Sequence, residues 1–240
     1  MEKDTLVEII KKRLALDGEE LAAVLANPKY QGLFENAVKG SRYRLVAEVM
    51  ASKGCHSGHA VGQRIIFDSA GNLYFSDSGE WKQGSGVVYR VGTNGKTSVF
   101  SAGPFHFTNG LAIDAREQYL YVIESNLNRV LRLEIKADGG AGQPEVFIEG
   151  MERGPDGLAF DAQGNLYVTT YATNCIYRVT PDRRVGLVCQ DRENLLLCQP
   201  TNCAFGGPNF DQLFVSNLGR DHISVLDLKI KGQSLWHHRM

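Results

Sequence analysis

Two different hydrophobic periodicities divide the chain near residue 41. In residues 1–41, apolar positions recur at helical spacing, as in Leu6, Ile10 and Leu14, which is typical of amphipathic helices. Further along, short runs rich in β-branched and aromatic residues alternate with turns rich in Gly, Asn and Asp. We therefore expect a helical N-terminal extension over 1–41 and a mainly β domain over 42–240.

A sequence repeat organises the expected β domain. Four segments share a polar residue, an apolar run, a turn and a second run of the Leu-Tyr-Val type, and the polar residues are Gln63, Asn109, Asp156 and Asn202. These positions follow one another at intervals of 46 or 47 residues. Such a period, with about four strands per unit, is typical of a β-propeller blade. Helical solenoids do not fit the period-two alternation, and an immunoglobulin-like sandwich would not repeat so regularly.

The shared register of these four polar residues predicts a common site. The first strand of each propeller blade lines the central channel, so residues that open these strands meet at one mouth of the channel. A ring of amide and carboxylate oxygens at that mouth suits a hard divalent cation such as calcium or magnesium. The competing interpretation is that Asn-Gly and Asp-Gly are ordinary turn dipeptides.

Composition narrows the classes of function. The chain has 26 Lys and Arg against 27 Asp and Glu, so it offers no long-range positive potential, and we expect no nucleic-acid partner. No apolar run approaches the roughly 18 to 20 residues of a membrane-spanning helix, and no membrane partner is expected. Charges interrupt the N-terminal apolar stretch, and the five cysteines form no C-x-x-C pair. We therefore expect reduced thiols and a cytoplasmic location. The oligomeric state stays open.

The three later units resemble consecutive blades of a known family. The segments TNGLAID (108–114), GPDGLAFD (154–161) and PTNCAFGG (200–207) are similar in order and spacing to blades of the gluconolactonase, regucalcin and luciferin-regenerating-enzyme superfamily. The resemblance implies a six-bladed propeller that hydrolyses sugar lactones or similar cyclic esters with one divalent cation. Calcium is the first candidate, with zinc or magnesium as alternatives. The resemblance also implies Asn109 and Asp156 as metal ligands, with Asp156 as the catalytic base.

The chain departs from the family pattern in two ways. The family takes a third ligand from a Glu-Gly-Pro segment of its opening blade, which this sequence lacks, and we expect the first blade and most of the second to be missing, with about four blades recognisable. Gln63 and Arg64 stand where the family carries substrate-contacting residues. We expect them, together with Asn202, to contact substrate. Glu124 is expected to lie away from the channel mouth and not to replace the missing ligand.

Two functions remain open. The first is a metal-dependent hydrolase acting on a small-molecule lactone, which the retained Asn109 and Asp156 favour. The second is a non-catalytic propeller-derived binding or scaffold protein, which the missing Glu favours. A zinc site at His56 and His59 is a weaker candidate, because two histidines are too few ligands. Cys203 has no recognisable catalytic partner and is expected to fill a small apolar space.

Overall fold

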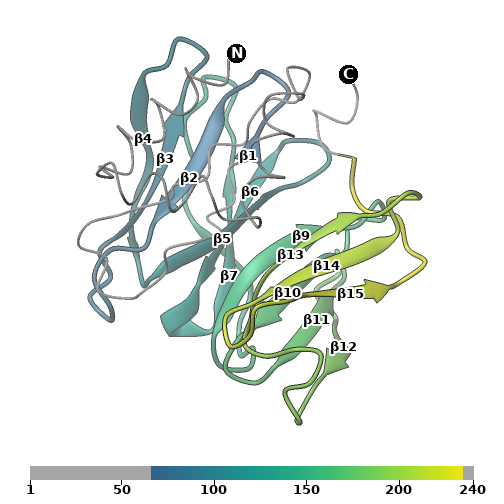
Figure 1. Cartoon of the computed structure of the whole chain (residues 1–240). Helices are drawn as coiled ribbons and strands as arrows, with labels where there is room; N and C mark the ends of the chain where they lie inside the picture. Colours follow the sequence, from purple (N-terminus) through teal and green to yellow (C-terminus); the bar gives the residue numbers. More distant parts are fainter. Residues whose placement is uncertain (1–65, 235–240) are drawn as a thin grey trace, which may run out of the picture. The chain divides into compact units, whose positions relative to one another are not determined.

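The computed structural model describes residues 66–234, which form four consecutive antiparallel β-sheets (Figure 1). Three sheets have four strands and one has three, and in each sheet the strands lie in chain order or its reverse. This succession of three- and four-stranded meanders is the blade organisation of a β-propeller, so the predicted fold class is confirmed. The helical extension expected over 1–41, and the boundary after it, lie outside the described residues.

The strands of each sheet follow the runs expected from the repeat. The first sheet contains β1 (Ile66–Phe67), β2 (Leu73–Asp77), β3 (Gly86–Val91) and β4 (Thr97–Phe105). The second contains β5 (Thr108–Ile113), β6 (Tyr119–Glu124), β7 (Arg129–Glu134) and β8 (Glu145–Ile148), with a short 3-10 helix, η1 (Ser125–Leu127), between β6 and β7. The third contains β9 (Pro155–Phe160), β10 (Leu166–Thr170), β11 (Cys175–Val179) and β12 (Val185–Gln190). The fourth contains β13 (Pro200–Gly206), β14 (Gln212–Asn217) and β15 (Ile223–Asp227).

A buried aspartate closes the turn between the first two strands in two of the sheets. In the first sheet, Asp68 accepts hydrogen bonds from the backbone N–H and the side-chain amide of Asn72, both at 2.8 Å, and from the Tyr74 hydroxyl at 3.2 Å. In the third sheet, Asp161 accepts the two corresponding bonds from Asn165, at 2.9 and 2.8 Å. Because a buried carboxylate is costly unless it is hydrogen-bonded, these contacts explain why the turn residues repeat with the blade.

Edge-to-face aromatic pairs join neighbouring sheets through their apolar cores. Tyr121 of the second sheet contacts Phe147 of its own sheet at 4.9 Å and Phe160 of the third sheet at 5.0 Å between ring centroids. Tyr167 of the third sheet contacts Phe205 of the fourth at 5.2 Å. Such pairs each add about 0.5–1.5 kcal/mol beyond the area that they bury, so the blades are stabilised by contacts between sheets as well as within them.

The described cysteines are consistent with the expected reduced state. Cys175 and Cys203 are buried, Cys189 and Cys198 are half-buried, and all four are free thiols. Cys203 packs in the apolar cluster between the third and fourth sheets, as expected for a small filler of the core. The fifth cysteine, Cys55, lies outside the described residues.

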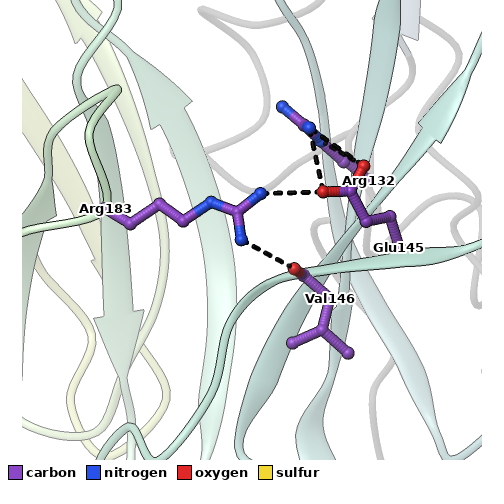
Figure 2. A network of polar contacts seen from close by, with 4 residues as sticks. All are labelled: Arg132, Glu145, Val146 and Arg183. Carbon is purple, nitrogen blue, oxygen red and sulfur yellow. Dashed lines mark hydrogen bonds and ion pairs between the residues drawn. The ribbon is translucent and has the colours of Figure 1, made fainter.

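A polar network connects the second sheet to a turn of the third (Figure 2). Glu145 on β8 accepts two hydrogen bonds from Arg132 of β7, at 3.0 and 2.9 Å, and one from Arg183 at 2.7 Å. Arg183 also donates to the carbonyl of Val146 and lies over the ring of Phe147, 5.6 Å from its centroid. The hydrogen bonds from Arg132 and then Arg183 lower the pKa of the Glu145 carboxyl. Because these side chains are partly exposed, solvent screens the network, which fixes geometry more than it adds stability.

The innermost strands β5, β9 and β13 approach so closely that glycine is required at their contacts. A Cβ atom on Gly110 would lie 2.5 Å from the carbonyl oxygen of Asp156, and one on Gly157 would lie 2.5 Å from the Cα of Asn202. Neither glycine has a positive φ, so space rather than turn geometry requires it. Asn109, Asp156 and Asn202 all lie inside strands, and the interpretation of their motifs as turn dipeptides is therefore wrong.

We expect Gly157→Ala to lower the free energy of unfolding by about 1–3 kcal/mol, because the added methyl group would press on the backbone of β13. Gly186 on β12 is a matched control, since the nearest atom to an added Cβ there is the Arg178 carbonyl oxygen at 4.0 Å. Gly186→Ala should be close to neutral. Urea unfolding followed by circular dichroism checks both variants, and equal stabilities would contradict the steric argument.

Candidate functional site

Asn109 and Asp156 lie side by side at one end of the inner strands. Each is the second residue of its strand, β5 and β9 respectively, and the Asn109 side chain is close enough to the Asp156 carboxylate to act on its pKa. Asn202, the third residue of β13, lies in the next inner strand, against Gly157. The structure thus brings three of the predicted site residues to one region. Two predicted site residues lie outside the described part of the chain: Gln63 and Arg64.

The Asp156 carboxylate is buried and only partly satisfied. Asp156 is 6% exposed, and its Oδ2 atom has no hydrogen-bond partner. Burial raises the pKa of this carboxyl to about 7, and the opposing effect of the hydrogen bond from Asn109 is smaller. A buried acceptor without a partner is costly, so this oxygen is suited to bind either a proton or a cation.

Two serines hydrogen-bond to Asn109, one through its side chain and the other through its backbone. Its side-chain Nδ2 donates to the Ser125 Oγ at 3.2 Å, and its backbone carbonyl accepts a hydrogen bond from the Ser76 hydroxyl at 2.9 Å. The Ser125 hydroxyl in turn donates to the carbonyl of Pro155 at 2.7 Å. The side chain from β5 is therefore linked to the backbone that directly precedes Asp156 in β9.

Sequence reasoning missed these serines, although one signal was present. A hydroxyl residue occupies the same repeat position in the second strand of three units: Ser76, Thr169 and Ser216. Each contacts the backbone of an inner strand, since Thr169 accepts from the N–H of Gly157 at 2.9 Å and Ser216 donates to the carbonyl of Asn202 at 3.4 Å. Ser125 carries no such signal, because it follows its strand and acts across two blades.

Glu124 lies at the same end of the second sheet as Asn109, because it pairs with Thr108 across β5 and β6. The expectation that it lies away from the mouth is therefore wrong. Its carboxylate is fully buried and accepts hydrogen bonds from the backbone N–H of His106 at 2.7 Å and from Nε of Arg129 at 2.5 Å. Because these contacts already satisfy the carboxylate, it remains a poor replacement for the missing ligand.

The loop between β2 and β3 borders the same end of the inner strands. The hydroxyl of Thr108, directly before Asn109, donates to the carbonyl of Asp77 at the start of this loop. Further along the loop, the Trp81 ring is 48% exposed and packs edge-on against Phe107, with 4.6 Å between ring centroids. Because Phe107 directly precedes β5, Trp81 supplies a partly exposed apolar ring near the start of that strand.

Two absences hold for residues 66–234. These residues contain no group of three or more His, Cys, Asp or Glu side chains placed to hold a metal ion. None of the helices found there is long and apolar enough to cross a membrane. The ligands that this part of the chain can offer a cation at Asp156 are therefore a mixed set of carboxylate and amide oxygens.

The fold and this group of residues define a β-propeller with a buried carboxylate and neighbouring amides where its inner strands meet. The family model described as SMP-30/Gluconolactonase/LRE-like region matches residues 64–218. This match covers more than half of the chain, which therefore belongs to that family, and the resemblance inferred from the blade motifs is confirmed.

The alignments with individual relatives cover only part of this chain and part of each relative. A protein named lactonase drp35, from Staphylococcus epidermidis, is 32% identical over 147 residues, which are 58% of this chain and 43% of the relative. Among solved structures, a luciferin-regenerating enzyme matches with a TM-score of 0.58 and 23% identity over 72% of this chain and 63% of its own. Regucalcin from Agrobacterium tumefaciens, described as a calcium-binding protein, matches with a TM-score of 0.59 and 21% identity. This match covers 72% of this chain and 62% of regucalcin. The two structures support the fold, and this chain spans less than half the length of the lactonase.

We expect Asp156 to make the metal-free protein less stable as the pH rises from about 4 to about 7. Its folded-state pKa of about 7 lies above the ordinary value of 3.8, so its contribution is fully present below pH 4 and is lost as the pH passes 7. Asp156→Asn cannot ionise and should remove up to roughly 4 kcal/mol of this loss, at 1.36 kcal/mol per pKa unit. Urea unfolding in EDTA across this range measures the difference, and parallel pH curves for the two proteins would contradict it.

Proposed function

We propose that this protein is a metal-dependent hydrolase of sugar lactones or similar cyclic esters, with Asn109 and Asp156 as ligands of one divalent cation, calcium being the first candidate. The observation that carries the proposal is the unpaired, buried Oδ2 of Asp156 beside the amide of Asn109. Membership of a family named for gluconolactonase supports the reaction class. A relative named lactonase is consistent with the proposed reaction, and a structural neighbour described as a calcium-binding protein is consistent with the proposed cation.

The residues present fit a hard cation. Carboxylate and amide oxygens are the ligands that calcium and magnesium prefer. Within residues 66–234, no residue donates a hydrogen bond to Oδ1 of Asn109 or to Oδ2 of Asp156, so both oxygens have lone pairs to offer. Because calcium takes six to eight oxygen ligands, the other positions would be filled by water, by substrate or by residues outside the described range.

The proposed mechanism assigns separate tasks to these side chains. A bound cation would polarise the lactone carbonyl and stabilise the negative charge that develops on its oxygen. Asp156 accepts a proton from the water that attacks the carbonyl carbon, and it donates this proton to the ring oxygen as the ring C–O bond breaks, which leaves a hydroxy acid. Trp81 is proposed to contact the apolar face of the lactone ring. Asn202, with Gln63 and Arg64, is proposed to hydrogen-bond the substrate.

A second candidate is a non-catalytic binding or scaffold protein derived from a propeller. The observation in its favour is that residues 66–234 supply no three-acid or histidine cluster for a metal. The free state of the four described cysteines is compatible with the cytoplasmic location that we propose for either function.

Asp156→Asn distinguishes the two candidates. We expect the unchanged protein to bind calcium and to gain roughly 2.7 kcal/mol of stability at 100 times the dissociation constant. The variant should lose this stabilisation, and its rate of lactone opening should fall by roughly 10²–10⁴-fold, because it loses both a ligand and the base. Calorimetric titration and acid release from gluconolactone measure the two effects.

The control for this experiment is Asp138→Asn, which changes an exposed aspartate in the loop between β7 and β8. Its Oδ1 accepts the N–H of Gly140 at 2.8 Å, and an asparagine oxygen can still accept that bond. This variant should bind calcium and open lactone as the unchanged protein does. If the unchanged protein neither binds the ion nor opens lactone above background, the hydrolase proposal is wrong and the scaffold candidate is favoured.

A further inference from the structure

We infer that Ser125 is a positioning residue that determines which atom of the Asn109 amide faces the cation. This inference rests on the metal site proposed above and deepens it. Ser125 begins η1 directly after β6 and is 5% exposed, so water does not compete freely for its hydroxyl. The residue touches neither the proposed cation nor the substrate, and it acts only through Asn109.

The hydrogen-bonding capacity of Ser125 determines the direction of each bond. Its Oγ lies 2.7 Å from the carbonyl oxygen of Pro155, which can only accept. The single hydroxyl hydrogen therefore points to Pro155, and Oγ acts as an acceptor on its other side. The atom of Asn109 that lies 3.2 Å from Oγ must then be the donor Nδ2 rather than the oxygen.

The same reasoning accounts for the rest of the amide. The Asn109 amide lies beside the Asp156 carboxylate, and its Nδ2 is committed to the Ser125 Oγ. Oδ1 is then the atom left for a ligand, beside the unpaired Oδ2 of Asp156. A reversed amide would place two oxygens, Oδ1 and Oγ, against each other and turn an NH₂ group toward the cation. Ser125 thus selects the orientation that can bind a metal.

Ser125 also links the two proposed ligands across blades. Pro155 directly precedes Asp156 in β9, while Asn109 belongs to β5. Partners of this kind, which orient a ligand without touching the metal, typically change metal affinity by about 10–100-fold when they are removed. We therefore expect Ser125→Ala to weaken calcium binding by roughly 10–100-fold in calorimetric titration.

Ser76→Ala is the matched control. The Ser76 hydroxyl donates to the backbone carbonyl of Asn109 at 2.9 Å, so its loss removes a bond to the same residue without affecting the amide orientation. We expect a change in calcium affinity of less than about 3-fold, well below the effect of a lost ligand-orienting partner. Equal losses in the two variants would show that any bond to Asn109 matters and would overturn the positioning role.

Asn109→Asp provides a second test, because a carboxylate has two equivalent oxygens and no wrong orientation. In that background Ser125→Ala should change calcium affinity by less than about 3-fold, compared with the 10–100-fold expected for a ligand-orienting group. An equally large loss in both backgrounds would mean that Ser125 acts through the Pro155 backbone alone, and the inference would be wrong.

The orientation is also measurable without metal. In nuclear magnetic resonance spectra, the side-chain NH₂ signals of Asn109, identified by their loss in Asn109→Asp, should be protected from solvent exchange. Ser125→Ala should remove this protection and Ser76→Ala should retain it, whereas unprotected signals in the unchanged protein would overturn the inference. If calcium fails to bind the unchanged protein, the proposed function fails, and this measurement still decides the role of Ser125.

Discussion

The close approach of the inner strands is the constraint on which the rest of the structure depends. Gly110 and Gly157 leave no room for a Cβ atom, so the backbones of β5, β9 and β13 meet directly. Only at this distance can the side chains of Asn109 and Asp156 lie beside each other, although they belong to different blades. A slip of one residue in any of these strands would turn its polar side chain to the opposite face. The glycines and the candidate site are therefore specified together.

The buried aspartates of this domain differ in how completely they are satisfied. Asp68 and Asp161 close turns, and hydrogen bonds reach both oxygens of each. Asp156 is equally buried, yet its Oδ2 has no partner and its pKa is raised to about 7. The same residue type thus supports the fold in the turns of two blades and opposes it in the inner strand of one of them. An unfavourable group that persists inside an otherwise satisfied structure is a candidate for function.

The blade repeat was predictable because it depends on local pattern. The intervals of 46 or 47 residues and the strand-like runs after each turn correspond to the observed sheets, and the polar register placed Asn109 beside Asp156. The competing interpretation of Asn109-Gly110 as a turn is wrong, because the glycine is required by the backbone of the next blade, which the local sequence does not show. The position of Glu124 depends on the pairing of β5 with β6, which the sequence alone does not reveal. The sequence also does not show that the Glu124 carboxylate already accepts a hydrogen bond from Arg129.

The charge of the proposed ligand pair bears on its chemistry. Asn109 contributes an oxygen without charge, so Asn109 and Asp156 together bring one negative charge to a divalent cation. The pair would leave a net positive charge facing the substrate, which strengthens the polarisation of a neutral ester carbonyl. A second carboxylate would bind the ion more tightly and cancel that charge. An amide ligand serves this purpose only when its oxygen points at the ion. The hydrogen bond from Asn109 to Ser125 would therefore matter to the proposed reaction as well as to the packing of two blades.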